Sequence, residues 1–151
     1  MLLESFLAFT HIMAFLMLAT FMTSETALCR TEWISAPIVH RLVRLNFLTL
    51  LSGALLLATG LARSGWGIKG ANWYWSQPLL HTKLTLLVVM LALAAAAGRH
   101  YRQWRAALTT DGQLPSAPAL RTARRLEMWA SHLMIVVVLL AVLLARGVGT
   151  R

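Results

Sequence analysis

The chain has 151 residues, of which 58% are hydrophobic and only 13% are charged, and it carries a formal net charge of +9. This composition is too apolar for an ordinary soluble domain, and the length suits one compact unit. The arginines stand at the ends of apolar stretches, which argues against a basic nucleic-acid-binding face. The single Cys29 excludes an internal disulfide. We therefore expect one transmembrane domain over residues 1–151 in contact with the lipid bilayer.

Four apolar stretches approach the roughly 20 residues that a helix needs to cross a bilayer. We expect helices over about 2–28, 38–63, 78–107 and 118–147, joined by short loops into an all-α integral membrane four-helix up-down bundle. The first stretch lacks a basic segment before it, so it is expected to stay in the mature protein. The third reaches spanning length only if it begins near Pro78, which places His81 and Lys83 inside the span.

The cations divide unequally between the two sides of this bundle. One side holds Arg30, Arg41, Arg44, Arg99, Arg102, Arg105, Arg121, Arg124 and Arg125, and the other holds Arg63, Lys69, Arg146 and Arg151. By the positive-inside rule the first side is cytoplasmic, so both termini are predicted on the outer side of the membrane. Aromatic residues are expected as interfacial belts: Trp66, Trp73, Tyr74 and Trp75 outside, and Trp33, Tyr101, Trp104 and Trp129 inside.

Ionisable side chains inside a span cost free energy and therefore mark functional candidates. They are Glu4, His11, Glu25, His81, Lys83 and His132. Glu4, His11 and Glu25 recur at helical spacing on one stripe of the first helix, which should face the bundle interior. His132 has no other histidine at its depth, and His40 and His100 stand among arginines, where a solvated or phosphate-facing role is expected.

His11 and His81 are expected at similar depths in the outer half, on helices that lie diagonally across the bundle. Two such imidazoles match the axial ligation of a b-type haem iron. The alternative is that each histidine is hydrogen-bonded to a hydroxyl or a backbone carbonyl, and the pattern leaves both open. Lys83 and Lys69 are candidates to contact the haem propionates, although Lys83 could instead pair with Glu4 or extend to the interface.

Several segments carry a resemblance that covers most of the chain. They are KGANWYWSQPLLHTKLTLL (69–87), RLVRLNFLTLLSGALLLATG (41–60), ARGVG (145–149), and the His11 segment followed by Glu25 and Arg30. Together they resemble a bacterial family of predicted four-helix inner-membrane proteins of unknown function. Asn46 is a departure, since an aspartate is expected there in that family.

A more distant resemblance rests on the histidine early in the first helix and on LHTKL (80–84). These features are similar to HemJ-type protoporphyrinogen oxidases and to CopD-like membrane proteins. The HemJ resemblance implies a four-helix membrane protein that binds haem b and oxidises a porphyrinogen. It supports haem b as cofactor, with His11 and His81 as ligands, and electron transfer from a hydrophobic reductant such as a porphyrinogen or a quinol. Whether the chain is an enzyme, such as a haem-dependent oxidoreductase, is left open.

Two other functions compete with the haem hypothesis. A copper-handling protein would use Met13, Met17 and Met22, because thioethers suit Cu(I), although methionine at helical spacing is more often packing. A non-catalytic assembly factor would pack through small residues, which also make a homodimer plausible. Those residues are Gly53, Ala54, Ala58, Gly60 and Ala94 to Gly98.

Overall fold

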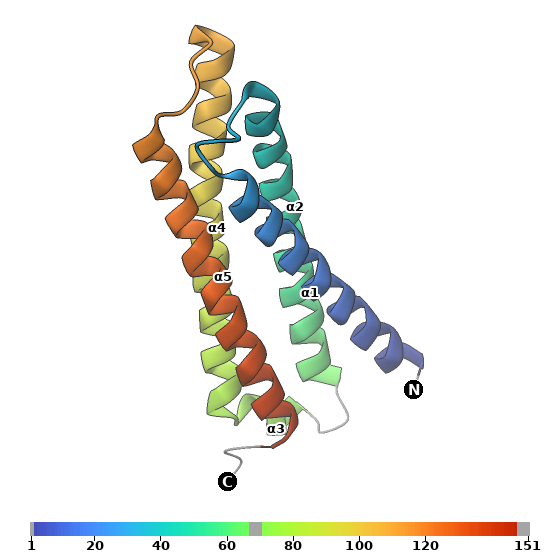
Figure 1. The fold of residues 1–151 in the computed structure, drawn as a ribbon. Helices are drawn as coiled ribbons and strands as arrows, with labels where there is room; N and C mark the ends of the chain where they lie inside the picture. Colours follow the sequence, from blue (N-terminus) through green and yellow to red (C-terminus); the bar gives the residue numbers. More distant parts are fainter. Residues whose placement is uncertain (1, 67–70, 148–151) are drawn as a thin grey trace.

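The computed structural model describes residues 2–66 and 71–147. Its helices are α1 (Leu2–Leu28), α2 (Ala36–Trp66), α3 (Ala71–Trp75), α4 (Pro78–Asp111) and α5 (Ala117–Ala145), as Figure 1 shows. The four long helices alternate in direction, which confirms the predicted all-α up-down bundle. The short α3 was not expected. The second and third spans are longer than predicted, since α2 runs from residue 36 to 66 and α4 continues to 111.

The long helices α1, α2, α4 and α5 are each long and apolar enough to cross a membrane. Large apolar side chains cover their outer surface, and Phe6, Phe47 and Ile135 are each about two-thirds exposed, at 65%, 65% and 67%. Such a surface suits lipid, where a helix also satisfies its own backbone groups. Outward-facing hydroxyl groups are also hydrogen-bonded within their own helix. The Thr10 hydroxyl, for example, donates to the Phe6 carbonyl at 2.9 Å.

Proline and glycine set the ends of the second pair of spans. Pro78 and Pro118 occupy the first turns of α4 and α5, where a missing amide proton costs nothing. Gly112 follows α4 in the left-handed conformation (φ 64°) that closes many helices. The proline positions agree with the predicted starts of these two helices, whereas α4 ends later than predicted.

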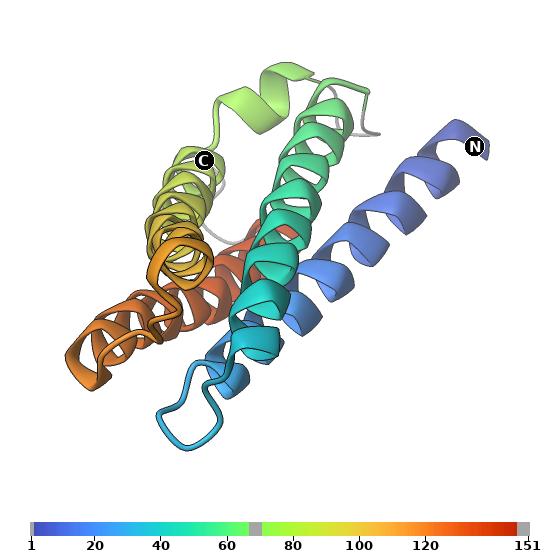
Figure 2. The ribbon, with the colours of Figure 1, turned by 90° about the horizontal axis from the view of Figure 1, so that it is seen from above.

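Helices α1 and α2 pack against each other along their length, as do α4 and α5, and α2 joins the two pairs through α4. Helices α1 and α4 therefore lie diagonally, as predicted. The contact between α1 and α5 is the weakest of those among the long helices. In Figures 1 and 2, α1 leans away from α5 toward its N-terminal end. The end of the bundle that carries α3 is called here the α3 end.

Two apolar clusters hold the bundle together. One lies toward the opposite end, called here the Arg-rich end because both of its loops are flanked by arginines, and contains Cys29, Val39, Leu42, Ala97, Tyr101, Trp104, Leu120 and Ala123. The second contains Ala14, Leu18, Met22, Leu56, Leu87, Met90 and Ala130. Small residues allow α2 and α4 to approach closely, since Gly53 packs against Leu91 and Gly98 packs against the Asn46 side chain. Ala54 and Ala58 face outward instead.

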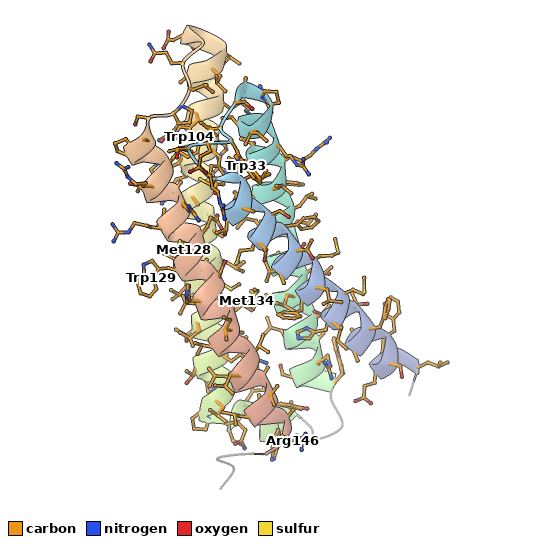
Figure 3. The ribbon with its side chains drawn as sticks, in the orientation of Figure 1. Trp33, Trp104, Met128, Trp129, Met134 and Arg146 are labelled. Carbon is orange, nitrogen blue, oxygen red and sulfur yellow. The ribbon has the colours of Figure 1, made fainter. Side chains whose placement is uncertain are left out.

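The aromatic residues expected in the interfacial belts differ in exposure. Trp33 and Trp129 are exposed at 56% and 63%, and Trp66 is exposed at the α3 end. Figure 3 shows Trp33 and Trp104 toward the Arg-rich end, with Trp129 on the outer side of α5. Tyr101 and Trp104 are buried, at 0% and 7% exposure, so the prediction that they anchor at the interface was wrong. Their rings pack together with centroids 5.4 Å apart because their positions on α4 face the other helices rather than lipid.

Candidate functional site

A cavity of about 480 Å³ lies among the four long helices, toward the α3 end. Its wall is almost entirely aliphatic, and its polar side chains are His11, Ser64 and Lys83. The apolar lining comes from α1 (Ile12, Phe15), α2 (Leu56, Leu57, Gly60), α4 (Leu80, Leu84, Leu87) and α5 (Val137, Val138, Ala141, Val142, Ala145). Mostly apolar cavities with a few convergent polar groups are the usual binding sites for small molecules.

His11 is held by α2. Its Nδ1 lies 2.9 Å from Oγ1 of Thr59, and the Thr59 hydroxyl donates to the Leu55 carbonyl at 2.7 Å. With the threonine proton on the backbone carbonyl, Thr59 Oγ1 can accept a proton from His11 Nδ1. In the neutral ring the other nitrogen, Nε2, then carries a lone pair. The ring also packs on Gly60, where an added Cβ would lie 3.3 Å from His11 Cε1.

Positive charge borders the same cavity. Lys83 lines it directly, and a smaller adjoining pocket of about 210 Å³ contains Arg63, Tyr74, His11 and Lys83. Arg63 and Lys83 are the charged neighbours of His11. Lys83 makes no ion pair with Glu4 in the part of the chain that the structure describes. The site therefore combines an apolar body, one imidazole and two cations, which suits a lipophilic molecule with an anionic end.

The other predicted ligands are placed elsewhere. His81 is exposed on α4, and its Nε2 lies 3.0 Å from the carbonyl oxygen of Trp75, whose ring is 5.9 Å away. It lines neither of the two pockets that contain His11. Lys69 falls outside the described residues. The structure thus brings His11 and Lys83 together but does not bring His81 to them, because one turn of α4 directs residues 81 and 83 to different sides.

A second polar cluster lies deeper in the bundle and toward the Arg-rich end. Glu25 of α1 and Glu127 of α5 are both fully buried, and their carboxyl groups are immediate neighbours. The Glu25 carboxylate accepts hydrogen bonds from Asn46 Nδ2 at 3.1 Å and from the hydroxyl of Thr49. Asn46 Nδ2 also donates to the Ala94 carbonyl at 2.9 Å. The predicted inward direction of His11 and Glu25 on α1 agrees with this arrangement.

Sequence reasoning missed Glu127. It precedes a long apolar stretch, so it resembles a boundary charge, and several arginines stand just before it. The signal was its distance from Pro118, since a helix that begins there carries residue 127 more than two turns inward. Its spacing from Ala123 and Ala130, both buried, would also have indicated the inner face of α5.

Comparison with known proteins gives a family. Residues 3–149 match a family described as predicted membrane proteins, DUF2214. The chain belongs to this family. No curated protein and no solved structure matches it. The expected membership of a membrane protein family of unknown function is therefore confirmed, and the chain is a multi-pass membrane protein with four apolar helices.

The remaining candidate residues of this DUF2214 protein lie apart from the His11 cavity and from the cluster of Glu25 and Glu127. His132 is exposed and contacts the Met128 carbonyl in its own helix at 2.6 Å. His40 lines a groove at the Arg-rich end with Arg41, Arg44 and Arg105. The three methionines of α1 do not converge, since Met13 and Met17 are each 40% exposed while Met22 is fully buried. Within the described ranges no group of three or more His, Cys, Asp or Glu side chains could hold a metal ion.

Proposed function

We propose that this protein binds haem b in the cavity that contains His11 and Lys83, and that it transfers electrons to or from a lipophilic partner in the membrane. The observation that carries the proposal is the His11 imidazole, whose ring lines an apolar cavity while its Nδ1 lies 2.9 Å from Thr59 Oγ1. A ligating histidine in proteins commonly has its second nitrogen fixed by such a hydrogen bond. The resemblance of the His11 segment to HemJ-type proteins implies the same cofactor.

The residues of the cavity suit the chemistry of haem b. Aliphatic walls from four helices would contact the macrocycle, and Lys83 and Arg63 would face the propionates. His11 would hold the haem iron. When bound, haem would supply one-electron redox chemistry, with a potential set by the imidazole ligand and by burial. A quinol or a porphyrinogen is the reductant class that a membrane-embedded site would accept.

The position of His81 alters the ligation expected from sequence. Its Nε2 meets the Trp75 carbonyl and its side chain is exposed, so we propose one protein ligand, His11, rather than two. Substitution of His81 should then leave the spectrum of the bound haem nearly unchanged. This expectation separates the present proposal from a bis-histidine centre.

The test is an absorption spectrum of the purified full-length protein in detergent, after supplementation with haem, oxidised and then reduced with dithionite. We expect a Soret band and reduced α and β bands in the wild type. His11→Ala should abolish or shift these bands, and His81→Ala should retain them. A monodisperse wild-type protein without Soret absorbance would refute the haem proposal, and loss of the bands in His81→Ala alone would refute the ligand assignment.

The two other functions lack a comparable observation. Copper binding through α1 would require all three methionines to converge, but Met22 is buried while Met13 and Met17 lie on the exposed side of the helix. An assembly role would use an exposed small-residue surface: Gly53 and Gly98 are occupied within the chain, which leaves Ala54 and Ala58 facing outward.

A further inference from the structure

The Glu25–Glu127 cluster lies apart from the His11 cavity, and neither glutamate lines that cavity. Four buried polar side chains come together in it from three helices: Glu25 from α1, Asn46 and Thr49 from α2, and Glu127 from α5. Tyr101 of α4 is fully buried, and its hydroxyl faces the same cluster beside Glu127 and Cys29. Charged groups at this depth are costly unless they are neutralised or used.

A count of donors and acceptors shows what the cluster lacks. Each oxygen of Glu25 accepts one hydrogen bond, from Thr49 or from Asn46. Neither oxygen of Glu127 meets a donor in the described chain, and the same holds for the Asn46 side-chain oxygen. Three buried acceptors are therefore unpaired, and the Tyr101 hydroxyl is the one buried donor of the cluster that is also unpaired. The cluster thus has more unpaired acceptors than donors, and an added proton or another cation would balance them.

The surrounding charged groups do not supply that charge. The titratable or charged groups near the pair are Cys29 at the end of α1, Tyr101 on α4 and Arg124 on α5. Arg124 stands nearly one turn from Glu127, yet its Nε is itself buried without a partner among the described residues. From α2 the neighbours are the uncharged Asn46 and Thr49. No cation of the described chain therefore neutralises the two carboxyl groups.

We infer that Glu25 and Glu127 form a proton-binding site, in which one exchangeable proton is carried on Glu127 and donated to Glu25. The assignment follows from the hydrogen bonds. Two donors stabilise Glu25 as the carboxylate, whereas neither oxygen of Glu127 is paired, and the Tyr101 hydroxyl beside it is the one donor near by. Glu127 gains a partner as soon as it carries a proton. Proton binding and release are the only chemical change at this site. The bound proton links α5 to α1 through a hydrogen bond between the two side chains, and its release leaves two facing carboxylates. This inference does not rest on the haem proposal.

The composition of the chain makes the site measurable by infrared spectroscopy. There are only five acidic side chains, and the other three are Glu4, Glu32 and Asp111. Glu32 is exposed in the loop after α1 and provides a matched control. The full-length protein in lipid or detergent is compared in H2O and in D2O near neutral pH. We expect a carboxylic acid C=O stretching band that shifts to lower frequency in D2O.

Variants then locate the proton. Glu127→Gln should remove the band, Glu127→Asp should retain it at a shifted position, and Glu32→Gln should leave it unchanged. Glu25→Gln should retain the band with a shift, because Glu127 remains the acid. The conservative aspartate variant keeps the test informative if the glutamine variant is poorly folded.

Several outcomes would overturn the inference. These are the absence of an acid band in the wild type, a band that does not move in D2O, or a band that is lost in Glu25→Gln and kept in Glu127→Gln. A cation site would give a different signature: no acid band, with carboxylate bands that change when sodium replaces choline in the buffer. Loss of the Soret band in the same samples would bear on the haem proposal and not on this one.

Discussion

Thr59 fixes the ring of His11 from the neighbouring helix: its Oγ1 lies 2.9 Å from His11 Nδ1 while its own proton is directed to the Leu55 carbonyl at 2.7 Å. A proton donated from His11 Nδ1 to Thr59 leaves the lone pair on Nε2. The same contact connects α1 to α2 beside the cavity.

Replacement of Thr59 by valine should weaken haem binding by about 10- to 100-fold, the usual effect of removing the group that orients a ligating histidine. Valine keeps the shape of the side chain and removes the acceptor. Thr59→Ser restores the hydroxyl and should bind nearly as the wild type does. Haem titration followed at the Soret band measures both, and equal affinities for all three proteins would contradict the proposed role.

The ring of His11 also depends on Gly60. A methyl group there would lie 3.3 Å from His11 Cε1, which is closer than most side-chain contacts, so the ring must shift. Gly60→Ala should weaken haem binding by less than Thr59→Val does, and it should change the position of the Soret band. Gly65→Ala is the control, because nothing lies within 4 Å of its added methyl group.

Lys83 is predicted to recognise the anionic end of the ligand. A hydrogen bond to a charged group contributes about 1.5–3 kcal/mol, so Lys83→Gln should reduce haem affinity roughly tenfold or more. Haem dimethyl ester lacks the carboxylates and should bind wild type and variant equally. A loss of the same size for haem and for the ester would show that Lys83 acts through packing instead.

Much of the fold could be predicted because lipid imposes strong rules on sequence. Spanning length, proline at helix starts and the distribution of arginine indicated four helices and their alternation. The diagonal placement of α1 and α4 followed from short loops alone. The short α3 could not be predicted, since its aromatic residues WYW fit an interfacial loop equally well.

The candidate sites were harder to predict because they depend on rotation about the helix axis. The membrane depth inferred from residue position correctly grouped His11 with the start of α4. Only the packing of α4 decides that Lys83 faces the cavity while His81 does not. In the same way Glu127 resembles a boundary charge until the rotation of α5 places it against Glu25. The hydropathy pattern indicates how deep a residue lies in the membrane, but it says little about which side of the helix that residue faces.

Close packing of α2 on α4 should depend on Gly98. A Cβ at this position would overlap the Asn46 side chain, which donates to both Glu25 and the Ala94 carbonyl. Gly98→Ala should therefore lower the free energy of unfolding by about 1–3 kcal/mol, the range found for overpacked sites. Denaturation in mixed micelles measures the change against Gly65→Ala, which should have little effect. Equal stability of the two variants would contradict this packing.

Cys29 should resist modification. Burial raises the pKa of its thiol to about 11, and its Sγ lies 3.7 Å from the Leu120 carbonyl. The thiolate is the reactive form, so each pH unit below that pKa lowers reactivity about tenfold. Maleimide labelling of the folded protein should be slow near neutral pH and rise only at strongly alkaline pH, whereas the SDS-denatured protein should label readily. Rapid labelling of the folded protein near neutral pH would show an accessible thiol.

The central claim is that His11 presents Nε2 to haem b in the cavity, and exogenous imidazole tests it most directly. In His11→Gly the cavity gains room where the ring was, so added imidazole can replace the missing side chain. We predict that His11→Gly shows little Soret absorbance after haem supplementation and that imidazole restores a spectrum close to that of the wild type. A His11→Gly protein that binds haem normally without imidazole would contradict the claim.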